Sequence, residues 1–271
     1  MPGKVPTTAE LDRLVAANRA IRDRATKDVK ALWAALVPTT AELDRLVAAN
    51  RAIRDRATKD VKALWVALVG LTAEQARDAL IAALPALVAR HGEVAATIAA
   101  DFYDEQRDIV DAPGRYTADL APVAEPKAIA ASTRWAVAPL FQAIPDMDAT
   151  LGRLVEVVDD KTIGQGKRTQ VLNAQRDPSQ PRVARVPVGK TCAWCRMLAS
   201  RGPVYQSEAT ALAASHSHCD CIPTPIWRGS VMPDGYDPRA LYADYRRAAD
   251  AARSSSPKAI LAEMRKQTGL A

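Results

Sequence analysis

Aromatic residues are scarce in this 271-residue sequence: they make up 5% of it, and only two of them are Phe. This scarcity, together with abundant alanine, disfavours a β sandwich and favours helices. No run of eighteen or more apolar residues is present, so we expect no segment to span a membrane. The first residues, "MPGKVPTTAELDR", contain no apolar signal core. Export through a signal peptide is therefore not expected, and the chain should be made and kept in a reducing cytosol.

Histidine and cysteine are also few, with three and four residues, and all but one of them lie between residues 192 and 221. The exception, His91, is interpreted as a favourable partner for the dipole at a helix C-terminus. The sequence contains neither an HExxH helix nor a GxSxG elbow, which removes two common signatures of hydrolases. In a reducing compartment, clustered cysteines more often bind a metal or act in catalysis than form disulfides.

The clustered residues follow the pattern C-x2-C, then H-x-H-C-x-C. Zinc in structural sites takes four thiolate or imidazole ligands in a tetrahedron. Two sets of four zinc ligands are possible: the four cysteines, or three cysteines with His216 in place of Cys219. His218 either binds the metal or donates a hydrogen bond to a ligand. Disulfides, and less strongly a cysteine nucleophile, remain alternatives. The candidate ligands of this structural zinc are Cys192, Cys195, His216, His218, Cys219 and Cys221.

The charge of the chain is uneven. Residues 1–150 hold 19 Lys+Arg and 20 Asp+Glu, whereas residues 151–271 hold 18 and 11. An anionic partner should therefore meet the C-terminal half first. Near the cysteines, Lys190, Arg196 and Arg201 could offset the negative charge of a thiolate site.

The N-terminal region contains a duplication. Residues 5–36 return as residues 37–68, and only Ala34 and Val66 differ. Such near-identity is typical of a recent duplication or of an artefact of sequence assembly, and two units are too few for a repeat array. In each copy, apolar residues recur at three- and four-residue steps, which predicts one amphipathic helix of about 42 Å at 1.5 Å per residue. One copy should suffice for the native protein.

Further helices are expected over residues 73–90, 93–110, 127–143 and 147–160, with Gly92 as a stop signal. The two glycines of "KTIGQGKRTQ" should then loosen the chain. In "PRVARVPVG", β-branched residues alternate with polar ones, which predicts a strand. We expect a second strand in "GPVYQS" and a last extended segment in "CDCIPTPIW". Two basic amphipathic helices close the chain. The fold class is thus a mainly α N-terminal region of long amphipathic helices followed by a small α+β module stapled by metal.

The segments "RVARVPVGKTCAWCRMLASRGPVY", "HSHCDC" and "PTPIW" resemble the MuF-like minor head proteins of tailed bacteriophages, in particular those of actinobacteriophages. Cys192 and Cys195 match the first motif of that family, and Gly202 matches its glycine. His216, Cys219 and Cys221 match the last motif, with Asp220 where many relatives have arginine. The resemblance covers about residues 168–227. It says nothing of the repeat. From the repeat, the helix pattern and the resemblance together we expect five regions: 1–36 and 37–69 (helical repeat copies), 70–160 (α-helical), 161–230 (MuF-like Cys/His module) and 231–271 (basic C-terminal helices).

The resemblance implies a non-enzymatic minor head protein of the virion, assembled in the host cytoplasm. Its partners would be the portal protein, the major capsid protein, or both, with weak contact to packaged DNA. A capsid maturation protease is one alternative, although no nucleophile–base pair is visible in the sequence. A zinc-containing nucleic-acid-binding module is the other, and the basic C-terminal helices favour it.

Overall fold

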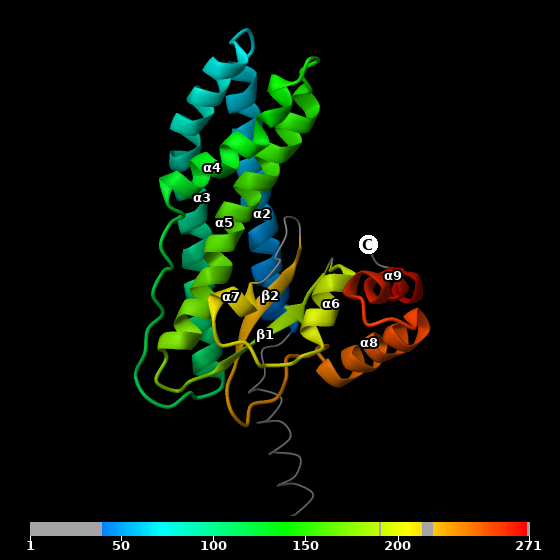
Figure 1. Ribbon diagram of the computed structural model, residues 1–271. Coiled ribbons are helices and arrows are strands. Elements are labelled where there is room, and N and C mark those ends of the chain that lie inside the picture. Colours follow the sequence, from blue (N-terminus) through cyan, green and yellow to red (C-terminus); the bar gives the residue numbers. More distant parts are fainter. Residues whose placement is uncertain (1–39, 190, 213–218, 270–271) are drawn as a thin grey trace, which may run out of the picture.

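The computed structural model describes residues 40–269, apart from residues 190 and 213–218 (Figure 1). Long helices lie side by side in an elongated bundle, and a small sheet with shorter helices lies at one end of it. The expected fold class, a mainly α region followed by a small α+β part, is confirmed. The bundle consists of α2 (Thr40–Ala67), α3 (Ala73–Ile109), α4 (Pro126–Ala136), the short 3-10 helix η1 (Ala138–Phe141) and α5 (Met147–Arg176).

Helix α2 is the second repeat copy, and it has the amphipathic face that its sequence predicts. Leu43, Leu46, Ile53, Ala57 and Val61 are all buried. The helix turns back into α3 after a short connection, and Thr72 and Gln75 form a capping box with hydrogen bonds in both directions. The first copy, residues 5–36, lies outside the described residues.

Helices α3 and α5 run uninterrupted through the glycines that we expected to end or loosen them, so those expectations are wrong. A Cβ at Gly92 would lie 2.3 Å from the side-chain oxygen Oε1 of Gln165, and one at Gly166 would lie 2.8 Å from the carbonyl oxygen of Ala95. The glycines therefore allow α3 and α5 to approach closely. Because α5 continues across the expected region boundary at residues 160/161, that boundary falls inside a helix.

This close approach predicts opposite effects for two Gly→Ala changes on α5. Gly166→Ala forces the helix away from the backbone of Ala95 and should cost about 1–3 kcal/mol of folding free energy, as overpacking usually does. At Gly152 nothing lies within 4 Å of the added Cβ. Gly152→Ala should therefore stabilise the protein by about 0.5–1 kcal/mol through helix propensity alone. Urea denaturation of both variants tests this, and equal effects would contradict it.

The C-terminal part is built on an antiparallel pair of strands, β1 (Arg182–Pro187) and β2 (Cys221–Ile226). Both were expected as extended segments. The further strand expected in "GPVYQS" is reduced to one bridge, in which Val183 and Tyr205 exchange backbone hydrogen bonds of 3.0 and 3.1 Å. The helices here are α6 (Ala193–Ala199), α7 (Glu208–Ala211), α8 (Pro238–Ala252) and α9 (Pro257–Thr268).

Two prolines of β2 lie opposite residues of β1: Pro223 pairs with Arg185, and Pro225 pairs with Val183. Proline has no backbone N–H, so it suits positions of an antiparallel ladder whose N–H points away from the partner strand. Val183 agrees with this, since its own N–H points away from β2 and donates to Tyr205.

A buried ion pair joins the end of α3 to the residue that follows α5. Arg107 donates to both carboxylate oxygens of Asp177, at 2.6 and 3.2 Å, and the hydroxyls of Tyr103 and Ser179 donate to the same carboxylate at 3.0 and 2.6 Å. Burial raises the pKa of Asp177, but the hydrogen bonds from Arg107, Ser179 and Tyr103 outweigh it and hold that pKa below its ordinary value.

Among the described residues, α3 alone is long and apolar enough to cross a membrane. One such helix is weak support for a membrane span, because core helices of soluble proteins meet the same criterion. Here Leu80, Leu84 and Val88 are fully buried in a cluster shared with α2, α4 and α5. The expectation that no segment spans a membrane remains a prediction.

Candidate metal centre

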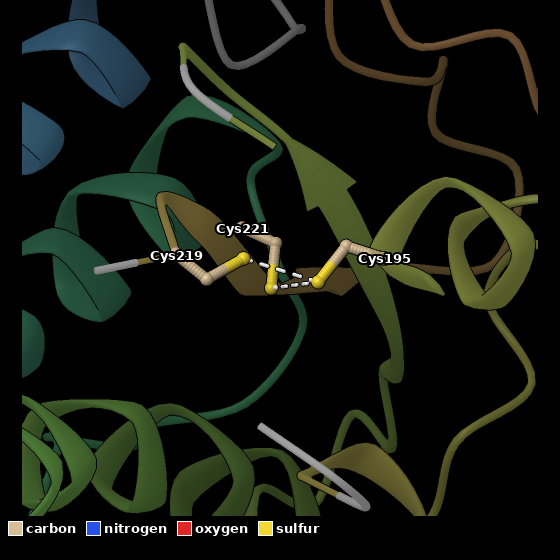
Figure 2. A group of neighbouring side chains, drawn as sticks. All are labelled: Cys195, Cys219 and Cys221. Carbon is tan, nitrogen blue, oxygen red and sulfur yellow. Dashed lines mark hydrogen bonds between the residues drawn. The ribbon is translucent and has the colours of Figure 1, made fainter. Parts of the chain in front are cut away.

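Three cysteine sulfurs meet between α6 and the start of β2, as Figure 2 shows. The Sγ of Cys195 lies 3.0 Å from that of Cys219 and 3.5 Å from that of Cys221. All three side chains are buried, and their ligand atoms lie within 4.8 Å of one another. Cys195 comes from the first turn of α6, whereas Cys219 and Cys221 flank the residue just before β2. The two halves of the sequence motif are therefore brought together by the fold.

Cys192 lies at the edge of this cluster. It is the N-cap of α6, where its sulfur accepts the backbone N–H of Cys195 at 3.4 Å, and it packs against the other three cysteines. The fold thus assembles all four predicted cysteine ligands. His216 and His218 lie outside the described residues, so their part in the site stays a prediction.

The donor set fits a zinc ion. At a Zn–S distance of about 2.3 Å, the sulfurs of a tetrahedral site lie about 3.8 Å apart. The observed separations of 3.0 and 3.5 Å need only a small expansion to reach that value. The structure describes all four cysteines, and none of them forms a disulfide.

A buried arginine that the sequence did not single out lies against the sulfurs. Arg185, on β1, is 1% exposed, and its Nη2 lies 3.2 Å from the Sγ of Cys221 and 3.7 Å from that of Cys195. Its positive charge offsets part of the negative charge that thiolates bring. The strand pattern contained the signal, because period-two alternation places Arg185 on the same face as Val183, which is buried.

One of the cations that we expected in this role, Arg196, has a different partner. Lys190 lies outside the described residues. Arg196 forms an ion pair with Asp244 of α8 at 3.1 Å instead. Lys167 of α5 lies nearer to the cluster, where its ammonium donates to the backbone carbonyl of Cys219 at 3.3 Å.

The contacts among the cysteines shift their pKa values in opposite directions. Hydrogen bonds from Cys195 and Cys219 lower the pKa of Cys221 well below its ordinary value, and the charges of Lys167 and Arg185 lower it further. The pKa of Cys195 is raised, first by its hydrogen bond with Cys192. A bound zinc ion would replace the protons that these thiols share, since cysteine ligates zinc as a thiolate and not as a thiol.

Asp220 connects the cluster to the helical bundle. It lies between two candidate ligands in sequence, and its carboxylate accepts hydrogen bonds from Arg51 at 2.5 Å and from Arg54 at 3.4 Å. Arg54 also pairs with the buried Asp159 of α5 at 2.5 Å. Helix α2 is thereby attached directly to the segment that carries Cys219 and Cys221.

His91 has a different place from the one expected. It lies inside α3, and its Nε2 contacts the carboxylate of Asp60 on α2 at 2.8 Å. The interpretation of His91 as a partner for a helix terminus is therefore wrong. Its role is a hydrogen bond that fastens α2 to α3.

Comparison with known proteins adds one match. No curated protein and no solved structure matches this chain. A family model described as "VG15 protein" matches residues 37–248, which is most of the chain and contains the bundle, the sheet and the cysteine cluster. The match begins at the first residue of the second repeat copy. The chain belongs to the VG15 protein family, a family of phage proteins, which indicates a virion-associated protein.

Proposed function

We propose that this protein is a MuF-like minor head protein, without enzymatic activity, that acts at the portal or on the inner side of the capsid during head assembly. Membership of a phage family over residues 37–248 is the observation that carries this proposal. The cysteine motifs support the finer assignment, because the fold assembles the four cysteines on which the MuF resemblance rests.

The cluster is proposed to hold a structural zinc ion. Structural sites have four protein ligands, whereas catalytic sites keep a position for water or substrate. Three buried sulfurs already meet here, Cys192 packs against them, and a guanidinium closes the side formed by β1. Such a site stabilises the small α+β part and leaves no position for a reacting molecule.

The contacts of His91 favour the non-enzymatic proposal over a capsid maturation protease. The His91–Asp60 pair resembles two members of a catalytic triad. Among the described residues, however, no hydroxyl or thiol is hydrogen-bonded to His91, and the imidazole is 8% exposed.

Ion pairing of the basic C-terminal helices argues against dedicated nucleic-acid binding. On α8, Arg246 pairs with Asp250 at 3.4 Å, and Arg247 pairs with Asp244. On α9, Lys266 pairs with Glu263 at 2.6 Å. Contacts with packaged DNA are therefore proposed to be weak and dependent on salt.

Cross-linking mass spectrometry on purified virions tests the proposal. We expect the protein in heads separated from tails, at few copies, with cross-links to the portal or the major capsid protein. Purified protein should contain one zinc per chain and should leave the major capsid protein intact. Absence from heads would contradict the proposed location. Cleavage of the capsid protein that a substitution at His91 abolishes would instead identify a protease.

A further inference from the structure

Helix α2 binds the rest of the molecule along its whole length through three apolar contacts. Its N-terminal turns pack with Phe102 of α3 and Ile222 of β2. Its middle packs between Ala95 and Ile163, and its C-terminal half packs with the core cluster of α3, α4 and α5. The buried α2 side chains that make these contacts are Leu43, Leu46, Val47, Ile53, Ala57 and Val61.

Polar contacts fix the register of α2 on this surface. Arg54 pairs with Asp159 and Asp220, Arg51 pairs with Asp220, and Asp60 contacts His91. A buried or half-buried charge that is left without its partner destabilises the folded protein. A helix that binds here must therefore present these side chains at these spacings.

The first repeat copy presents the same side chains at the same spacings. The difference between the copies, Ala34 in place of Val66, falls at a position where the α2 side chain is 68% exposed and contributes nothing to the contact. The first-copy residues that correspond to the binding residues of α2 are Leu11, Leu14, Val15, Arg19, Ile21, Arg22, Ala25, Asp28 and Val29.

We propose that the surface covered by α2 is a binding site for either repeat copy, and that the first copy of the same chain is its second ligand. The family match begins at residue 37, so the family fold uses one copy and the first is additional. When the second copy leaves the site, the first copy binds through the same contacts. The proposal does not depend on the proposed function.

The length of the connection to α3 determines which repeat copy occupies the site. The second copy is joined to α3 by residues 68–72, whereas the first would be joined by residues 36–72. Loop closure costs (3/2)RT ln n, so the longer connection disfavours the first copy by about 20-fold. The second copy therefore holds the site in nearly all molecules, and the first acts as a reserve. Because both copies belong to one chain, the exchange is independent of protein concentration.

Paired substitutions in chains with one or two copies test this inference. Leu43→Ala with Ile53→Ala removes two buried side chains, and in a chain lacking residues 5–36 it should lower the folding equilibrium constant by roughly 1,000-fold or more. In the full chain the loss should stop at about 20-fold, because the unaltered first copy takes the site. Equilibrium denaturation in urea measures both constants.

Three controls complete the set. Leu11→Ala with Ile21→Ala in the full chain should leave stability unchanged within about 2-fold, since that copy is the reserve. All four substitutions together should restore the full loss. Deletion of residues 5–36 alone should leave cooperative unfolding intact. Equal losses in the one-copy and two-copy chains would overturn the inference, as would unfolding of the remainder on deletion.

Discussion

Cys195→Ser is expected to abolish stoichiometric zinc and to loosen residues from about 182 to 227 while α3, α4 and α5 stay folded. The α+β part has a small apolar core of its own, and structural zinc binding provides on the order of 10 kcal/mol, which appears as folding free energy. Cys195 is the sulfur that contacts both Cys219 and Cys221. Hydrogen exchange, read by mass spectrometry, should show fast exchange in that segment and unchanged exchange in α3, α4 and α5.

The effect should also reach the N-terminal half of α2, because Asp220 and Ile222 both contact it. Ser200→Ala provides the control, since Ser200 follows α6 and, within the described part of the chain, its hydroxyl donates to the carbonyl of Met197 alone. That variant should keep its zinc and its exchange pattern. Chelated wild-type protein should behave like Cys195→Ser, and unchanged exchange after metal removal would disprove a structural zinc.

Asp177→Asn should destabilise the protein by about 3–5 kcal/mol, because it leaves the buried guanidinium of Arg107 without its counter-charge. The loss should be measurable by urea denaturation at neutral pH. Since the pKa of Asp177 is lowered in the folded state, its contribution is present above the ordinary aspartate pKa of about 3.9 and disappears as the pH falls through the lower folded value. The wild type should thus lose this stability in acid, whereas the variant has none of it to lose.

Asp119→Asn is the matched control. Asp119 pairs with Arg176 of α5 at 2.9 Å, but its side chain is 63% exposed. Exposed ion pairs contribute about 0–1 kcal/mol, so this change should be nearly silent. If both variants lose similar amounts of folding free energy, the buried Arg107–Asp177 pair contributes no more to stability than an exposed pair.

Periodicity and motif spacing predicted the helices and the gathering of cysteines, because both depend on local sequence. The α2 face and the strands around residues 182–187 and 221–226 agree with the expectations. Gly92 and Gly166 were misread because a glycine that ends a helix and one that admits a neighbouring helix look the same in sequence. Only the crossing of α3 and α5 distinguishes them.

The surroundings of the cysteines could be predicted less well. Arg185 and Asp220 act on the cluster through contacts between segments far apart in the chain, and the partners of Asp220 on α2 are more than 160 residues away. Charges close in sequence were therefore poor guides to the charges close in space. Arg196 illustrates this, since α8 supplies its partner Asp244.

The prolines of β2 also determine what the small sheet can bind. A strand edge with regular backbone donors invites a strand from a neighbouring molecule, which is a common route to aggregation. On the outer edge of β2, Pro223 and Pro225 offer no donor, and on the other side Tyr205 takes the backbone groups of Val183. Both edges of the sheet therefore offer fewer free backbone groups to an added strand, which disfavours edge-to-edge joining of neighbouring chains.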